Sequence, residues 1–405
     1  MIKRYRIIYL SFLFSVLFTL NLLAQEVADT KYWIIFKDKG DYKPDMTITV
    51  NSDAYNVAVS QLSEKSINRR LKVLSSDNVV DFLDLPVNEN YITEIKNSGI
   101  NIIAKSRWMN GVSAYLTQTQ VQQVLKLDFV KGLKLVKQFI TQNDINTKIF
   151  NNDNQNYSSF SIGGEYLYNY GGSLKQMDMV KVPEVHNLGF NGQGIMVASF
   201  DDGFEWKKHE ALRDLKVIDE YDFINEDNNV GKEKNQRYED SKQQGTHGTA
   251  TLSAFCGFKN GKLVSPSFGA TIILAKTEYT PTETPMEEDY WLEAAEWAES
   301  KGVEVVTSSL GYKVFDAPFS KNSYTYEDYD GRTTIVAIAS SRMAHLGVVV
   351  CISAGNYNQT DPPSIANGDA DSVICVGAVA RHSATSPRSM RTISVDSFTI
   401  APPAA

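Results

Sequence analysis

The stretch IMVASFDDG, residues 195–203, decides the fold because an apolar run passes directly into two carboxylates and a glycine. A near-continuous apolar run of this length is typical of a strand buried on both faces, as in a parallel sheet covered by helices. Four more runs of this kind follow along the chain, at residues 271–275, 303–307, 348–352 and 373–376. We therefore predict five buried strands in one mostly parallel sheet.

Helical patterns lie between the predicted strands. Residues 284–287, Thr-Pro-Met-Glu, have the form of a capping box with proline at the first helical position. Trp291 and the alanines three, four and seven residues after it then fall on one helical face. Residues 333–346 are a second predicted helix, closed by Gly347 just before a strand. Alternating strands and helices predict a doubly wound α/β domain, with its site outside the carboxyl ends of the strands.

The residues before this domain follow a different pattern. Residues 32–36 predict a strand, 62–71 a helix, 101–116 two strands around Asn110-Gly111, and 117–125 a further helix. These elements make up a small α+β domain, which we place at 25–140. Asparagine and glycine dominate 141–175, which is predicted to be a linker. The α/β domain then takes 176–380.

The first residues predict the compartment. Lys3, Arg4 and Arg6 precede an apolar run at 7–23 that ends near Ala24, which is the order of a secretory signal peptide. We therefore predict a signal peptide at 1–24 and a secreted protein with no stable membrane span after cleavage; an uncleaved anchor is the alternative. A net charge of −8 argues against a nucleic-acid partner.

The chain has three cysteines, an odd and sparse count that excludes a disulfide framework. Cys351 and Cys375 lie inside apolar runs and are predicted to be small buried core residues.

Polar residues of catalytic type follow three of the predicted strands. These are Asp201-Asp202-Gly203, Ser308-Ser309-Leu310-Gly311 and Ser353-Ala354-Gly355-Asn356, and Gly245-Thr-His247-Gly-Thr249 lies between the first two. Each motif alone is more often a turn or a helix cap. Their order and their positions at strand ends favour one site, within which we interpret Asp202 and Ser308 as structural.

In this order the four motifs resemble those of the subtilisin-like serine proteases, although the Ala-Thr-Leu after Gly-Thr-His-Gly-Thr departs from that family's usual His-Val-Ala. The resemblance implies an Asp-His-Ser triad with His247 as general base and acid and Asp201 as the carboxylate that orients it. It also implies that the Asn356 amide donates to the oxyanion. Ser309, Leu310 and Gly311 would offer a strand edge to a peptide substrate.

The resemblance extends to the α+β domain. The stretches Asp84-Leu-Pro-Val-Asn and Ser106-Arg-Trp-Met-Asn resemble propeptides of exported subtilisin-like proteases from Bacteroidetes-type bacteria. The partners that follow are protein or peptide substrates and the chain's own propeptide, acting as an intramolecular inhibitor.

The nucleophile of the resemblance is missing. The family's serine stands in Gly-Thr-Ser at a helix start, whereas here no glycine follows Gly377 and no such motif follows Asn356. Residues 381–405 contain three arginines but no lysine, and we interpret them as an aberrant tail behind a truncated catalytic domain. The 405-residue chain is therefore expected to be inactive by the triad route. The alternative is a secreted pseudo-protease that binds peptides without cleaving them.

A second alternative is a metal-dependent polysaccharide deacetylase, because Ser199-Phe-Asp-Asp-Gly203 resembles that family's Thr-Phe-Asp-Asp-Gly. Such enzymes also need a His-x-x-x-His pair, and no two of the five histidines are four residues apart. We therefore expect no catalytic metal and no cofactor. A structural calcium ion in the loop 225–235 is left open, with a solvated loop as the favoured interpretation.

Overall fold

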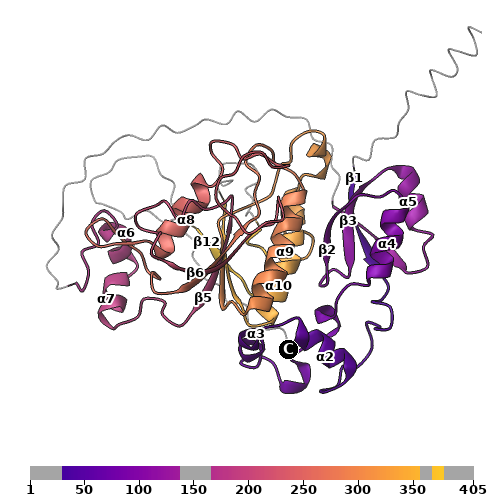
Figure 1. Cartoon of the computed structure of the whole chain (residues 1–405), viewed down its shortest axis with the longest axis horizontal. Helices are drawn as coiled ribbons and strands as arrows, with labels where there is room; N and C mark the ends of the chain where they lie inside the picture. Colours follow the sequence, from indigo (N-terminus) through magenta and orange to yellow (C-terminus); the bar gives the residue numbers. More distant parts are fainter. Residues whose placement is uncertain (1–29, 137–165, 356–366, 378–405) are drawn as a thin grey trace, which may run out of the picture.

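The computed structural model describes residues 30–136, 166–355 and 367–377, and contains two main sheets. A four-stranded antiparallel sheet has the order β2-β3-β1-β4, and a six-stranded parallel sheet has the order β12-β11-β10-β5-β9-β6. Helices α9 and α10 lie between the two sheets (Figure 1). The arrangement confirms the predicted α/β fold preceded by a small α+β domain.

The parallel sheet contains the five predicted strands and one more. Its strands are β5 (Met196–Asp201), β6 (Lys216–Asp222), β9 (Thr271–Lys276), β10 (Val305–Ser308), β11 (Val349–Ser353) and β12 (Ile374–Val376). The unexpected strand is β6, which lies at the edge of the sheet beside β9. Its polar sequence, KVIDEYD, shows that an edge strand does not need the apolar run that marks a central one.

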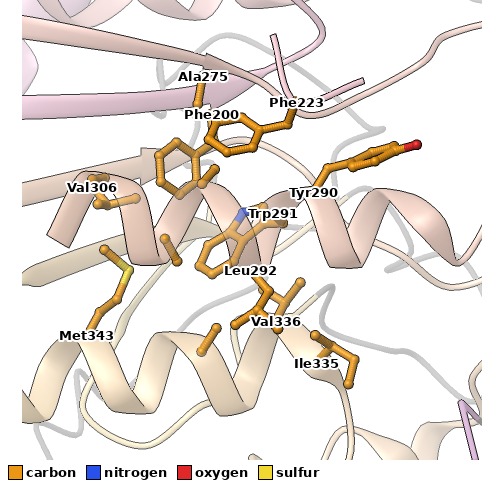
Figure 2. Close-up of a cluster of buried hydrophobic side chains, with 14 of the residues drawn as sticks. Phe200, Phe223, Ala275, Tyr290, Trp291, Leu292, Val306, Ile335, Val336 and Met343 are labelled. Atoms are coloured by element: carbon orange, nitrogen blue, oxygen red, sulfur yellow. The ribbon is translucent and has the colours of Figure 1, made fainter. Parts of the chain in front are cut away.

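Helices cover both faces of this sheet. Helix α8 (Thr246–Cys256) covers one face, while α9 (Met286–Lys301) and α10 (Ile335–His345) cover the other (Figure 1). On the α9 side, Trp291 is fully buried with its ring 5.3 Å from that of Phe200 on β5. Figure 2 shows the tryptophan between Phe200 and the α10 side chains Val336 and Met343. The predicted core face of this helix is therefore correct.

Shorter elements complete the α/β domain. They are α6 (Leu174–Met179), α7 (Val182–Asn187), the β7 (Phe258–Lys259) and β8 (Leu263–Val264) hairpin, and the 3-10 turns η3 (Phe319–Asn322) and η4 (Tyr326–Asp328).

The N-terminal domain is built on its own sheet. The strands are β1 (Thr30–Phe36), β2 (Ile102–Ser106), β3 (Gly111–Leu116) and β4 (Val130–Leu135), and the helices are α2 (Asp53–Ser60), α3 (Glu64–Arg70), α4 (Glu89–Asn97) and α5 (Gln118–Val124), with η1 (Ser76–Asn78) and η2 (Phe82–Asp84). Along β1, Ile34 and Phe36 belong to the domain's own core, whereas Trp33 joins the core that contains α9. Alternate residues of one strand therefore serve two cores.

Sequence reasoning missed three of these elements, α2, α4 and β4. Two are short helices with mixed surfaces, and β4 is another edge strand, with two lysines and a glycine among its six residues.

The far end of the predicted linker, 141–175, packs on the α/β domain and differs from the prediction. Tyr170 is buried, and its hydroxyl lies 2.6 Å from the Nδ1 atom of buried His186. Gly171 forms a bridge with Leu263. These contacts hold the end of this segment against the α/β domain, which its asparagine- and glycine-rich sequence does not predict.

The predictions for 1–24 and 381–405 lie outside the described residues. Among the residues that are described, no helix is long and apolar enough to cross a membrane. All three cysteines are free thiols. Cys256 is buried, but Cys351 and Cys375 are only half-buried, on β11 and on β12, the last described strand at that side of the sheet.

Candidate active site

Asp201 ends β5, a central strand of the sheet, and is almost completely buried. Its Oδ1 atom accepts a hydrogen bond from the Asp202 amide at 2.8 Å, and its Oδ2 atom accepts one from the Thr251 hydroxyl at 2.9 Å. A buried carboxylate held by donors on both oxygens is fixed in orientation.

His247 is the second residue of α8, and its Nδ1 atom lies 2.6 Å from Asp201 Oδ1. The two residues are 46 positions apart in the sequence, and the structure brings them together as predicted. The histidine side chain is 53 % exposed. The hydrogen bond to Asp201 raises the pKa of His247, and the charge on Asp202 acts in the same direction. With Nδ1 engaged, Nε2 is the ring nitrogen that would face a reacting hydroxyl.

Asp202 has a different task from Asp201. Its Oδ1 atom accepts the Gly248 amide at 2.7 Å and its Oδ2 atom accepts the His247 amide at 3.4 Å, so it satisfies donors at the start of α8. Burial raises the pKa of Asp202 to about 6 and the Asp201 charge adds to the rise, while the two amides oppose it. This geometry supports the structural interpretation of Asp202.

Glycines let the helix start approach the strand end. A methyl group at Gly248 would lie 2.2 Å from the Gly203 carbonyl oxygen and 2.9 Å from the Asp201 Cβ atom. Gly203 has φ +117° and Gly245 has φ +73°, values that other residues rarely adopt. The glycines around His247 are therefore needed to bring its ring to the carboxylate.

The segment Ser309–Leu310–Gly311 continues from β10 at the same edge of the sheet. In the ladder Ser308 pairs with Phe200, so Ser309 follows at about the level of Asp201 on the neighbouring strand. The Ser309 side chain is exposed, and residues 309–311 have no regular secondary structure. Ser308 is buried and accepts a hydrogen bond from Trp291 Nε1 at 3.0 Å, in keeping with a structural role.

Asn356 lies outside the described residues, so its predicted oxyanion role stays a prediction. The strand that leads to it, β11, is parallel to β10 in register, with Ile352 opposite Ser308. It ends at Ser353, whose hydroxyl accepts the Gly355 amide at 3.0 Å.

Within the described ranges, two groups of carboxylate and imidazole side chains are close enough to share a metal ion, Asp201–Asp202–His247 and Glu278–Glu283–Glu287. In the first group the oxygen and nitrogen atoms already make the hydrogen bonds described above, so the donor set fits a hydrogen-bonded triad better than a metal centre. In the loop 225–235, the Asn225, Asp227 and Asn229 side-chain oxygens accept backbone N–H groups. The calcium possibility stays a prediction.

Sequence reasoning missed three residues that support the site. Thr251, the donor to Asp201, lies four residues after His247 on the same helical face, which is a signal that could have identified it. Buried Gln244 accepts from the Thr280 amide at 3.0 Å and donates to the carbonyls of Asp202 and Glu278. Buried Lys276 pairs with Asp222 and Asp240, each at 2.8 Å. No local pattern distinguishes these last two from surface residues.

Two family models match this chain. One, described as the subtilase family, matches residues 192–404, and the other, described as a peptidase S8 propeptide domain of Bacteroidota, matches residues 31–154. The first match covers the site residues Asp201, His247 and 309–311, and the second covers the N-terminal domain.

Similar proteins include subtilisin amylosacchariticus from Bacillus subtilis subsp. amylosacchariticus, 26 % identical over 206 residues, which are 50 % of this chain and 45 % of that protein. The subtilisin of Bacillus pumilus is 24 % identical over 205 residues, which are 50 % of this chain and 63 % of that protein. This chain therefore spans about half to two thirds of these relatives. The crystal structure of fervidolysin from Fervidobacterium pennivorans, described as a keratinolytic enzyme related to subtilisin, has a TM-score of 0.42 and 18 % identity over 66 % of this chain and 38 % of that one.

Proposed function

The chain belongs to the subtilase family, and we propose that it is the precursor of a secreted serine-type endopeptidase that hydrolyses peptide bonds with an Asp-His-Ser triad. The observation that carries the proposal is the hydrogen bond of 2.6 Å between buried Asp201 and half-exposed His247 at the carboxyl end of the parallel sheet. Asp201 is shielded from water and can orient the ring, while His247 is accessible to a substrate, as a triad requires.

In the proposed mechanism His247 Nε2 takes the proton of the serine hydroxyl and then donates it to the leaving amine. Asp201 holds the ring in the tautomer with hydrogen on Nδ1 and stabilises the imidazolium. Asn356 would donate to the oxyanion, and the 309–311 segment would bind the substrate as an added strand. Because the pKa of His247 is raised, the ring becomes an effective base only at a correspondingly higher pH.

The N-terminal domain is proposed to be an inhibitory propeptide. The propeptide family match at 31–154 supports this, as does the contact between its sheet and α9. There Asp289 pairs with Lys31 at 2.6 Å and accepts from Trp33 Nε1 at 3.1 Å, with Asp289 and Lys31 both fully buried.

The serine is the open element of the proposal. No Gly-Thr-Ser follows Asn356 in the 405 residues, so we hypothesise that this chain alone does not hydrolyse peptides. A non-catalytic peptide-binding protein with the same groove is the alternative function.

The proposal is tested by reading the gene beyond the codon for Ala380 in all three frames, where a Gly-Thr-Ser motif is expected. The protein that contains this segment should hydrolyse casein and react with a fluorophosphonate. His247→Ala should lower turnover by about 10⁶-fold, the scale of the loss in subtilisin, which is a relative. Hydrolysis that survives this change would contradict the triad.

The 405-residue chain itself is the matched comparison. It is expected to bind fluorescent casein peptides and leave them intact. Cleavage that is sensitive to serine-directed inhibitors would overturn the hypothesis of inactivity. A reproducible gene end without the motif in any frame would favour the peptide-binding function.

A further inference from the structure

Helix α3 of the N-terminal domain is seated on the C-terminal ends of α9 and α10 (Figure 1). Both helices end at glycines in the left-handed conformation, Gly302 with φ +90° and Gly347 with φ +84°. A methyl group at Gly302 would lie 2.7 Å from the Ser66 amide nitrogen, and one at Gly347 would lie 2.9 Å from a Val73 methyl. The contact is therefore tight enough to exclude side chains at both helix ends.

Arg69 and Ser63 satisfy backbone carbonyls at these two ends. Arg69 Nε donates to the Leu346 carbonyl at 3.1 Å, after α10, and its Nη1 donates to the Val303 carbonyl at 2.7 Å, after α9. The Ser63 amide donates to the Ser300 carbonyl at 2.8 Å. The last carbonyls of a helix lack partners within the helix, so these donors from the N-terminal domain complete two helices of the α/β domain.

Arg70 makes the central contact. It is fully buried and binds Glu299 of α9 through Nε at 2.8 Å and Nη2 at 2.7 Å. The other side of its guanidinium binds Asp84 at 2.8 and 2.9 Å. Arg69 and Ser66 also donate to Glu299. These three donors to the Glu299 carboxylate all belong to the N-terminal domain. Arg70 binds the carboxylate with two N–H groups at once, which a lysine side chain cannot do in this fixed geometry.

Charges are balanced at this contact. Arg342 of α10 reaches back to Asp81, with N–O distances of 2.6 and 2.8 Å, and approaches Asp84 at 3.4 Å. Burial acts to raise the pKa of Glu299 and of Asp84, but Arg70 and the neighbouring arginines together outweigh it, so both pKa values are lowered.

The contact between the sheet and α9 is different. There Glu293 accepts the Lys105 amide at 3.1 Å, and burial raises its pKa to about 8, with Asp289 and Glu296 nearby. That contact therefore holds a carboxylate, Glu293, whose pKa burial raises beside its paired neighbour Asp289, whereas both carboxylates around Arg70 are paired with arginine.

We propose that Glu299 and the C-terminal ends of α9 and α10 form a receptor site for the paired arginines Arg69 and Arg70, and that this site sets how tightly the N-terminal domain is held. The inference rests on the proposed propeptide function of that domain. It implies that a cut in the chain between the two domains leaves them associated until this contact opens.

The test uses the full chain with a cleavage sequence for a specific protease placed within 141–165. After cleavage, the release of the N-terminal fragment from the immobilised α/β domain is followed. Arg70→Met should accelerate release about 100-fold or more, because it leaves Glu299 and Asp84 buried without their main partner. Glu299→Gln, which leaves the N-terminal domain unchanged, should do the same.

Lys105→Met is the control, since it also removes one positive charge from the N-terminal domain but breaks only the exposed pair with Glu89. Its release rate should stay within about fivefold of the parent. Should Glu299→Gln fail to fold, Arg70→Met and Arg69→Ala decide, since neither alters the α/β domain. Release within fivefold of the parent in the folded variants, or equal acceleration in the control, would overturn the receptor site.

The assay reads association and not hydrolysis. A chain that never cleaves casein can still show the effect, and an active protease can lack it. Failure of the receptor site is therefore distinguishable from failure of the proposed function.

Discussion

At the scale of single residues, the adjacent carboxylates Asp201 and Asp202 at the end of β5 differ in the groups that they bind. Asp201 turns to the His247 ring and Asp202 turns to the amides at the start of α8. The sequence Asp-Asp-Gly does not distinguish them, but the position of the helix start does. The pairing of one carboxylate with an imidazole is what links the site to proton transfer.

Asp201→Asn is expected to lower the pKa of His247, because the hydrogen bond to a charged acceptor is lost. The change is measured from the pH dependence of the ring Cε1–H resonance. Asp202→Asn is the control and should lower the pKa less, since it removes a nearby charge but not the hydrogen bond. Equal decreases in the two variants would contradict the assignment.

The same pair makes stability depend on pH. The folded-state pKa of His247 lies above its ordinary value of 6.5. The contribution of the pair is therefore fully present below about pH 6.5 and is lost as the pH rises through the higher folded-state pKa.

At the scale of elements, the site depends on how closely α8 approaches the end of β5. Gly248 is the contact point, because a methyl group there would meet the Gly203 carbonyl oxygen at 2.2 Å. The helix start and the strand end therefore behave as one unit, and a displacement of the helix would separate the ring from its carboxylate.

Gly248→Ala is expected to destabilise the fold by about 1–3 kcal/mol through overpacking and to lower the pKa of His247 as Asp201→Asn does. Thermal unfolding and the same resonance measure the two effects. Gly132→Ala on β4 is the matched control, because nothing lies within 4 Å of the added methyl group. An unchanged His247 pKa in Gly248→Ala would show that the helix approach does not set the pair.

At the scale of the whole molecule, the two domains share a core and exchange polar partners across α9. Trp33 and Trp108 of the N-terminal domain belong to the same buried cluster as Trp291. Around them, carboxylates of α9 are covered by the N-terminal domain, some with arginine or lysine partners and some without. We therefore expect part of the pH dependence of the protein's stability to come from the contact between the domains.

Glu293→Gln should become more stabilising, relative to the parent chain, as the pH rises from 5 to 9. The folded-state pKa of Glu293 is raised to about 8 from an ordinary value of 4.5, so its favourable contribution is present below pH 4.5 and lost as the pH rises through 8. Unfolding temperatures of both chains at pH 5, 7 and 9 measure the difference. Glu94→Gln on the exposed face of α4 is the control and should show no trend.

Much of this protein was determined by its sequence alone, because central parallel strands require continuous apolar runs and strand ends in one sheet meet at one edge. Five strands of the larger sheet and the core face of α9 follow from local apolar patterns. The pairing of Asp201 with His247 was expected from the resemblance of the ordered motifs to those of the subtilisin-like serine proteases. The edge strand β6 did not follow from its sequence, because Asp222 is its only buried residue and its pattern is polar.

Only the tertiary structure determined that acidic residues on α9 are buried. Asp289 and Glu299 have no local signal of burial, yet both are fully buried, and their partners Lys31 and Arg70 lie more than two hundred positions away in the sequence. Gln244 likewise has no local pattern that predicts its hydrogen bonds to the carbonyls of Asp202 and Glu278. The apolar periodicity of a segment predicts which of its side chains are buried. The partner of a buried charge is fixed only when the fold brings distant segments together.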